Sequence, residues 1–431
     1  DRAEYRYGGG EPLMTAVSEP DTRTVVIVGT GIAGSGAAQA LRKEGFGGSI
    51  ILIGSEPEEP YRRPALSKEL LSGKASFDRV RLRPSTFWTE QSIDLRIGAT
   101  VTSIDTDSRT VLLADGDSID YDVLILATGG RSRRLENEDS ERVHYLRDIA
   151  DMRRLQSQLI EGSSLLVVGG GLIGSEVAST ARDLGCSVQV LEAQPLPLSR
   201  LLPPSIAEKI AALHALAGVD LQTGVDLETL TTGADGVTAR ARDGREWTAD
   251  LAVVAIGSLP DTDVAAAAGI AVDNGISVDR YLRTSVVDVY AIGDVANVPN
   301  GFLGGMHRGE HWNTAQDHAV AVAKTIVGKE EPFESVPWSW SNQFGRNIQV
   351  AGWPGADDTV IVRGDLDSYD FTAICMRDGN IVGAVSVGRP KDIRAVRTLI
   401  ERSPDISADV LADTNRDLTE LAAGLVASPV L

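Results

Sequence analysis

A short apolar run followed at once by a glycine-rich turn occurs twice in this chain. Residues 24–28 (TVVIV) lead into residues 29–34 (GTGIAG), and residues 165–168 (LLVV) lead into residues 169–174 (GGGLIG). Continuous β-branched and aliphatic runs are typical of strands buried on both faces of a parallel sheet. Both turns have the spacing G-x-G-x-x-G, which permits a tight turn, a close approach of backbone to a pyrophosphate and a helix packed on its strand. The sequence therefore predicts two nucleotide-binding units of one design.

A helix and a second strand are expected after each turn, which completes a βαβ unit. The expected helices are residues 35–43 and 175–184, and the expected strands are residues 49–53 and 187–191. Three later runs, at residues 122–129, 250–257 and 289–294, are short strands that end in glycine or Gly-Asp. The first two would close the two units at the carboxyl ends of their strands, where ligands of doubly wound folds bind.

The residues at the ends of the second strands indicate which nucleotides are bound. An acid at this place binds ribose hydroxyls. In the first unit the place is taken by Ser55 or Glu56, and both remain candidates. In the second unit it is taken by Glu192, and no Lys or Arg follows before Arg200. Because an acid repels a 2′-phosphate, the second unit is expected to prefer NADH to NADPH. Two G-x-G-x-x-G turns imply two bound dinucleotides, and FAD with NADH is the simplest pair that accounts for both.

The pattern changes after about residue 328. Three of the six tryptophans lie between residues 336 and 353, and later segments favour antiparallel strands and one helix. We therefore expect an α/β chain with two Rossmann-like dinucleotide-binding domains, the NAD domain being inserted in the FAD domain, plus a C-terminal α+β domain. The expected boundaries are 22–140 with 260–330 for the FAD domain, 141–259 for the NAD domain and 331–431 for a C-terminal interface domain. Residues 1–21 are expected to be a disordered extension or one added upstream by cloning.

Charge and cysteine content exclude several classes of protein. The chain has 41 Lys and Arg against 61 Asp and Glu, a net charge of −20, which argues against nucleic-acid and membrane-surface binding. Its two cysteines, Cys186 and Cys375, exclude a disulfide scaffold and a Cys-x-x-Cys metal site, and we expect no metal. No apolar stretch approaches the ~18 residues of a membrane helix. The expected compartment is the cytoplasm, and the expected state is a monomer or weak homodimer.

Residues 61–68 (YRRPALSK) carry a more specific signal. They resemble the PYxRPxLSK signature of FAD-dependent NADH:ferredoxin reductases of the putidaredoxin reductase type, within the pyridine nucleotide-disulfide oxidoreductase superfamily. The resemblance extends over residues 22–403 and includes further matching segments at residues 127–129, 145–147, 169–176, 290–294, 310–312 and 337–343.

The resemblance implies roles for individual side chains. It places Lys68 beside the flavin N5, paired with Glu176, and a cation there would stabilise electron density arriving on the flavin. The alternative is a surface ion pair of little energetic value. Asp294 would hold the ribitol hydroxyls, unless it only caps a helix. Trp312 would shield the ring, unless it is a plain core residue, and His311 is expected to be mostly structural.

The remaining cofactor contacts implied by the two glycine-rich turns and the resemblance form two groups. The expected FAD contacts are Gly29, Gly31, Ala33, Gly34, Ser55, Glu56, Arg63, Lys68, Val101, Ala127, Thr128, Gly129, Arg147, Gly293, Asp294, Glu310, His311, Trp312 and Trp340. The expected NADH contacts are Gly169, Gly171, Leu172, Ile173, Gly174, Glu176, Glu192, Arg200 and Gly257.

The chain departs from related patterns at two places. Disulfide reductases of the superfamily place a reactive cysteine near the segment that matches residues 61–68, and none occurs here, so electrons are expected to leave the flavin directly. Ser339 and Asn342 stand where the family usually has Phe and Asp, which leaves the acceptor open.

The expected function is transfer of a hydride from NADH to FAD, followed by transfer of single electrons to a [2Fe–2S] ferredoxin that serves a cytochrome P450 or Rieske oxygenase. Candidate docking residues for an acidic ferredoxin are Arg79, Arg81, Arg83, Arg389, Lys391, Arg394, Arg397 and Arg402. The alternative is that they are ordinary solvated charges. Two alternatives stay open: a reductase for rubredoxin, a quinone or a small biosynthetic substrate, and a redox-gated binding protein resembling apoptosis-inducing factor.

Overall fold

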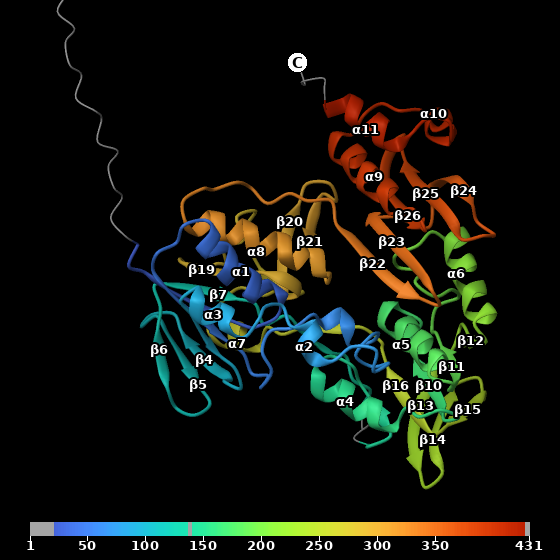
Figure 1. Cartoon of the computed structure of the whole chain (residues 1–431), viewed down its shortest axis with the longest axis horizontal. Helices are drawn as coiled ribbons and strands as arrows, with labels where there is room; N and C mark the ends of the chain where they lie inside the picture. Colours follow the sequence, from blue (N-terminus) through green and yellow to red (C-terminus); the bar gives the residue numbers. More distant parts are fainter. Residues whose placement is uncertain (1–20, 137–139, 427–431) are drawn as a thin grey trace, which may run out of the picture.

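The computed structural model describes residues 21–136 and 140–426, so the extension expected at residues 1–21 lies outside it except for Asp21. Two five-stranded parallel sheets and one five-stranded antiparallel sheet form the framework, and helices pack on each of them (Figure 1). Within the described ranges no helix combines the length and the apolar character that a membrane crossing requires.

The first parallel sheet has the strand order β19-β7-β1-β2-β3. Its strands are β1 (Thr24–Val28), β2 (Ser49–Ile53), β3 (Ile93–Arg96), β7 (Val123–Leu126) and β19 (Val289–Ala291). Strand β1 is central because its aliphatic side chains are covered on both faces. Helix α1 (Ile32–Lys43) packs beside helix α8 (Trp312–Ile326), as Figure 1 shows.

The second parallel sheet repeats this arrangement with the order β12-β11-β10-β16-β9. Its strands are β9 (Val143–His144), β10 (Ser164–Val168), β11 (Ser187–Leu191), β12 (Asp220–Gln222) and β16 (Leu251–Val254), and the helix that follows β10 is α5 (Leu172–Asp183). In both sheets the strand that leads into the glycine turn is central, with the next strand on one side and the closing strand on the other. Each helix begins at the fourth residue of its turn, three residues earlier than expected, because the last three turn residues form its first helical turn.

The chain leaves the first sheet after β7, builds the second sheet and returns at β19. The outgoing and returning segments pair as two short antiparallel strands, β8 (Gly130–Ser132) and β17 (Ser258–Pro260). The Arg133 N–H also donates to the Gly257 carbonyl at 2.9 Å. The second unit is thus inserted in the first through a paired connection.

The C-terminal sheet is antiparallel with the order β22-β23-β26-β25-β24. Its elements are β22 (Trp338–Gln343), β23 (Arg346–Gly352), β24 (Thr359–Asp365), β25 (Asp370–Arg377), β26 (Asn380–Val387) and the helices α9 (Pro390–Arg402), α10 (Ala408–Ala412) and α11 (Leu418–Val426). Its edge strand β22 packs against α5 of the second unit (Figure 1). This contact joins the C-terminal part to the centre of the molecule.

The remaining helices and strands do not belong to these three sheets. They are α2 (Phe77–Val80), α3 (Thr86–Glu90), α4 (Ile149–Gln158), α6 (Pro204–Leu216), α7 (Asp263–Ala267), η1 (Arg63–Ala65), η2 (Gly293–Val295), β4 (Val101–Asp105), β5 (Thr110–Leu113), β6 (Ser118–Asp120), β13 (Leu227–Gly233), β14 (Gly236–Ala241), β15 (Glu246–Ala249), β18 (Ile276–Ser277), β20 (Ala296–Asn300) and β21 (Gly305–His307).

The three glycines of the first turn have different structural roles. A Cβ on Gly29 would lie 2.1 Å from the Ala127 carbonyl oxygen, and φ there is +115°. A Cβ on Gly34 would lie 1.9 Å from the Gly29 carbonyl oxygen. A Cβ on Gly31 would meet no atom within 4 Å. The outer glycines therefore serve the packing of backbone on backbone, whereas the middle glycine faces open space.

We predict that Gly34→Ala destabilises the protein without cofactor by about 3 kcal/mol or more, because its methyl group would overlap the Gly29 carbonyl oxygen. Gly31→Ala is the matched control, and its cost should stay below about 1 kcal/mol, the range of an N-cap substitution. Thermal unfolding followed by circular dichroism measures both. Equal unfolding temperatures for the two variants would contradict the separation of roles.

Candidate functional site

A cleft of about 980 Å³ opens at the carboxyl ends of strands β1, β2 and β7. Its walls come from the start of α1, the segment 63–68, the first turns of α5 and α8, and the edge strand β22. Of the residues proposed from the sequence, those that line it are Gly29, Gly31, Ala33, Ser55, Glu56, Arg63, Lys68, Val101, Ala127, Thr128, Gly129, Arg147, Leu172, Ile173, Glu176, Asp294, Glu310, His311, Trp312 and Trp340.

Eight of the proposed residues do not line this cleft. Gly34 and Gly293 lie directly behind it, where they allow close packing: a Cβ on Gly293 would lie 2.8 Å from the Ala33 Cβ. The other six belong to the second glycine turn and its surroundings, namely Gly169, Gly171, Gly174, Glu192, Arg200 and Gly257. The first glycine-rich turn therefore lines the cleft, whereas the glycines of the second turn lie outside it. The helix α5 that follows the second turn still reaches the cleft through Leu172, Ile173 and Glu176.

The N-terminus of α1 has the features of a phosphate site. Its N-cap residue, Gly31, makes no side-chain capping bond, and the first turn contains no acidic residue. The free N–H groups and the helix dipole therefore favour an anion at this end. Because nothing would contact a Cβ on Gly31, the backbone here is open to a ligand.

The ion pair between Lys68 and Glu176 forms the wall at the other end of the cleft. The Lys68 Nζ donates to the Glu176 Oε2 at 2.5 Å, and only 16% of the lysine side chain and 7% of the glutamate side chain are exposed. The Ser67 hydroxyl donates to the same oxygen at 2.5 Å, and the Ser341 hydroxyl donates to Oε1 at 2.7 Å. The Glu176 carboxylate is thus buried and accepts bonds from three side chains, which excludes the alternative of a surface ion pair.

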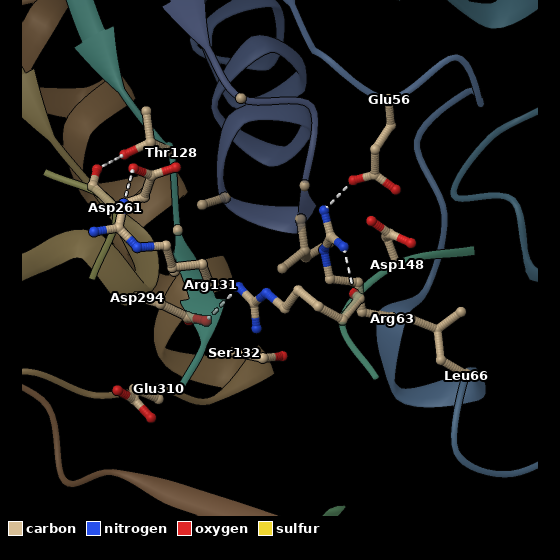
Figure 2. Close-up of a pocket in the computed structure, with 18 of the residues that line it drawn as sticks. Glu56, Arg63, Leu66, Thr128, Arg131, Ser132, Asp148, Asp261, Asp294 and Glu310 are labelled. Carbon is tan, nitrogen blue, oxygen red and sulfur yellow. Dashed lines mark hydrogen bonds and ion pairs between the residues drawn. The ribbon is translucent and has the colours of Figure 1, made fainter. Parts of the chain in front are cut away.

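Arg147 connects the two sides of the cleft. One guanidinium nitrogen lies 3.3 Å from the Asp294 carboxylate. Its backbone N–H donates to Asp151 at 2.9 Å, and its carbonyl accepts from Arg63 at 2.7 Å. Figure 2 shows Asp294 and Arg63 on opposite sides of this pocket. The main chain of Arg147 is thereby fixed, while its charged end faces the cleft.

The Glu56 carboxylate is already bonded to other side chains, unlike an acid that is free to bind a ribose. Its carboxylate pairs with Arg63, as drawn in Figure 2, and accepts a hydrogen bond from the Tyr61 hydroxyl at 2.6 Å. The Arg63 guanidinium also lies 5.5 Å from the centre of the Tyr61 ring. Burial raises the pKa of Tyr61, so this residue stays a neutral donor. Glu56 thus anchors the segment that carries Lys68, whereas its neighbour Ser55 is exposed at the cleft.

Asp294 is presented by a buried turn and does not cap an α-helix. It lies in the short helix η2, and its side chain pairs with Arg147. Behind it, the Gly293 N–H donates to the Nδ1 of His318 at 3.1 Å. His318 is 1% exposed, and burial lowers its pKa to about 3, so the ring is a neutral acceptor.

Glu310, His311 and Trp312, around the start of α8, line the cleft, and so does Trp340 of strand β22. The Glu310 carboxylate is paired with Arg308, and burial lowers the pKa of His311. Trp312 is half-buried, as is Trp340, whose ring centre lies 5.7 Å from that of Trp338. Both residues line the cleft, so neither is a plain core tryptophan.

Glu192 lies at the end of β11 and faces the second glycine turn. Its carboxylate accepts from the Gly170 N–H at 2.6 Å and from the Gln194 N–H at 2.8 Å. These bonds hold the acid beside the turn. Arg200 is exposed, and a Cβ on Gly257 would meet nothing within 4 Å.

The two cysteines are remote from this chemistry. Both are buried, and neither lines the cleft. The Cys186 thiol donates to the Ile160 carbonyl at 3.3 Å, and burial raises the pKa of Cys375 to about 12. Neither residue is placed to act as a redox thiol.

Two side chains at the site, Ser67 and Ser341, were not among the site residues predicted from the sequence. The alternation of β22 indicates that Ser339, Ser341 and Gln343 share a face, and all three are buried. Ser339, which stands where the family usually has Phe, lines the cleft. Asn342, which stands where the family usually has Asp, is exposed and accepts a hydrogen bond from Asn347.

Comparison with known proteins gives matches over nearly the whole chain. The family model described as pyridine nucleotide-disulphide oxidoreductase matches residues 23–319, and the one described as reductase C-terminal matches residues 338–422. Rhodocoxin reductase of Rhodococcus erythropolis is 38% identical over 400 residues, which cover 92% of this chain and 93% of the relative. The ferredoxin–NAD(+) reductase component of the p-cumate 2,3-dioxygenase system of Pseudomonas putida is 37% identical over 406 residues, covering 93% and 99%.

A solved structure of the covalent putidaredoxin reductase–putidaredoxin complex superimposes with a TM-score of 0.90. The sequence identity is 34%, and the match covers 95% of this chain and 100% of the compared chain. The arrangement of two parallel sheets and a C-terminal antiparallel sheet is therefore common to both proteins.

We predict that His318 makes stability depend on pH. Its pKa of about 3 in the folded protein lies below its ordinary value of 6.5, so the unfolded chain binds a proton that the folded chain does not. This contribution is fully present above pH 6.5 and is lost as the pH falls from 6.5 toward 3, at up to about 1.4 kcal/mol per pH unit.

His318→Asn is the matched variant, because the amide oxygen can accept from Gly293 without titrating. Denaturant unfolding at pH 7, 6 and 5 should show a smaller loss of stability in the variant than in the parent. Parallel losses would rule out His318 as the source.

Proposed function

The chain belongs to the pyridine nucleotide-disulphide oxidoreductase family, and we propose that within it this protein is an FAD-dependent NADH:ferredoxin reductase. The relatives named as ferredoxin–NAD(+) reductases support this assignment. The single observation that carries it is the junction of Lys68, from the first unit, with Glu176, from the second, at the wall of one cleft. This junction brings a cation to the place where two dinucleotides would meet.

FAD fits the large cleft in chemical terms. The open backbone at Gly31 and the N-terminus of α1 would take its pyrophosphate, with Arg147 as a counter-charge. Asp294 would accept from ribitol hydroxyls, and Ser55 or Glu56 would meet the adenosine ribose. When bound, FAD would supply an acceptor for the hydride of NADH and a donor of single electrons.

The second glycine turn would bind NADH. Glu192 is held by two backbone N–H groups and would accept from the free ribose hydroxyls, whereas a 2′-phosphate would meet its negative charge. Leu172 and Ile173 would guide the nicotinamide toward the cleft, since both line it at the start of α5.

The chain's own residues set the conditions for hydride transfer. The ammonium of Lys68 would stabilise negative charge that develops near it, and the low exposure of the Lys68–Glu176 pair strengthens this interaction. Trp312 and Trp340 would restrict water on the open side. No cysteine lies at the cleft, so electrons would leave without a dithiol relay.

The C-terminal helix α9 is the better supported docking surface for an acidic ferredoxin. Arg397 lies over the Trp338 ring at 5.8 Å, and Trp338 is adjacent to the cleft residue Trp340. Lys391 and Arg394 are exposed on the same helix. In the other basic segment, Arg81 is paired with Glu59 and Asp78, and Arg83 donates to Gln39. Arg389 is also engaged, by Asp370.

The function is tested by anaerobic titration of the FAD-loaded protein with NADH, followed by visible absorbance. About one equivalent of NADH should bleach the flavin band, and a [2Fe–2S] ferredoxin should then reoxidise the protein faster than rubredoxin or a quinone. No bleaching would overturn the assignment. Slow turnover with every acceptor, together with dimerisation on addition of NADH, would instead support a redox-gated binding protein.

We predict that Glu192→Gln reduces the preference for NADH over NADPH about tenfold, or about 1.4 kcal/mol, because the amide keeps one acceptor oxygen but removes the charge. Glu208→Gln, at an exposed position of the same unit, controls for the change in net charge. The ratio of kcat/KM for the two nucleotides measures the effect. An unchanged ratio would remove Glu192 from the specificity site.

We predict that the double variant Lys391→Glu and Arg394→Glu lowers kcat/KM for ferredoxin at least tenfold at low salt and flattens its salt dependence. The rate of flavin reduction by NADH should not change, because neither residue lines the cleft. Arg79→Glu in the other basic segment is the control. A larger loss for Arg79→Glu than for the α9 variant would move the docking surface to that segment.

A further inference from the structure

We infer that Ser341 is a positioning residue for the reaction, through which the C-terminal sheet fixes the Glu176 carboxylate that holds Lys68 at the cleft. This inference rests on the proposed function, because it assigns a role in the same hydride-transfer site. The role differs from that of Lys68 itself, since Ser341 touches neither the cleft nor the lysine.

The geometry around Glu176 gives each carboxylate oxygen its own donors. Oε2 accepts from Lys68 and Ser67, both in the first unit, at 2.5 Å each. Oε1 accepts from Ser341, in strand β22, at 2.7 Å. Glu176 itself belongs to α5 of the second unit. Three parts of the molecule that are distant in sequence therefore meet at one carboxylate.

The Ser341 hydroxyl has a defined direction. The Gln343 side-chain amide donates to it at 2.9 Å, which leaves the hydroxyl proton to point at Glu176. Ser341 and Gln343 are each 1% exposed, so water does not compete for these bonds. The hydroxyl is thus a preset donor rather than a freely rotating one.

A buried carboxylate with one donor missing is costly, because charged groups lose most when they are left unsatisfied away from water. Without Ser341, Glu176 would recover its lost bond by rotating or by admitting water. Rotation moves Oε2 away from the position that Lys68 and Ser67 share, and an admitted water is a less firmly held donor than the Ser341 hydroxyl. The consequence is a less well fixed ammonium at the place where charge develops during the reaction.

Neighbouring contacts hold α5 against both of the parts that meet at Glu176. The Phe344 N–H, directly after β22, donates to the Ser179 hydroxyl of α5 at 2.7 Å, and the Thr180 hydroxyl of α5 donates to the Ser67 carbonyl of the first unit at 2.7 Å. These bonds do not involve Glu176 and remain in a Ser341 variant. Loss of the single hydroxyl should therefore change the position of the carboxylate without separating α5 from either part.

The test compares Ser341→Ala with Ser341→Thr and with Ser386→Ala. Ser386 is as buried as Ser341 and lies in the same sheet, but its hydroxyl bonds only to Thr372 and to the Arg389 carbonyl. Ser386→Ala therefore controls for the loss of any buried hydroxyl from the C-terminal sheet. Ser341→Thr keeps the hydroxyl and should restore the parent behaviour.

Three readouts separate positioning from a purely structural effect. In the protein without cofactor, reductive methylation followed by mass spectrometry should modify Lys68 several times faster in Ser341→Ala than in the parent. In the FAD-loaded protein, the kcat for NADH should fall about tenfold with little change in KM. The reduction equilibrium of the bound flavin should shift by up to tenfold, or about 30 mV for a two-electron couple.

Equal methylation of Lys68 in Ser341→Ala and Ser386→Ala, with equal kcat and potential, would overturn the inference. If NADH does not reduce the parent protein, the proposed function fails, and the methylation experiment still decides whether Ser341 fixes the Glu176–Lys68 pair. The two failures are therefore distinguishable.

Discussion

The buried carboxylate of Glu176 is the interaction on which the centre of the molecule depends. A charge that is removed from water is tolerated only when a counter-ion and further hydrogen bonds satisfy it. Here the first unit supplies Lys68 and Ser67, and the C-terminal sheet supplies Ser341. None of the three parts can satisfy this charge alone. Correct assembly of the parts and correct placement of the ammonium are therefore one requirement.

The repeated strand and glycine-turn pattern was sufficient to predict the three central strands of each parallel sheet, because local backbone geometry dictates the pattern, whereas the edge strands β3, β9 and β12 were not predicted. Gly29 and Gly34 are required by contacts within a few residues or with the adjacent strand. The bonds of Ser341 and of Glu56 were beyond such reasoning. Strand alternation indicates which face Ser341 occupies, but its partner lies 165 residues away. Glu56 satisfied the ribose pattern, and only the fold reveals that Arg63 and Tyr61 already bind it.

The basic clusters illustrate the same limit for electrostatics. Sequence proximity groups Arg79, Arg81 and Arg83, yet Arg81 is neutralised by Glu59 and Asp78 in the folded chain. A cluster of like charges predicts a binding surface only when acids from elsewhere do not pair with it. Lys391 and Arg394 of α9 are exposed, and Arg397 of the same helix lies over the ring of Trp338, in the strand that borders the cleft.

The paired strands β8 and β17 have a consequence for how this architecture can change. Because they run antiparallel and lie side by side, the two ends of the inserted unit are adjacent. A unit with adjacent ends enters and leaves the host chain at one place, so its replacement leaves the order of the host strands intact, provided that the new unit again presents a carboxylate to Lys68 and Ser341. A different nucleotide-binding module of matching span can be spliced at this junction while the first sheet keeps its strand order. The covalent connection of the inserted unit is thus simple, whereas its contact with the host is demanding, because Leu172, Ile173 and Glu176 of that unit line the cleft.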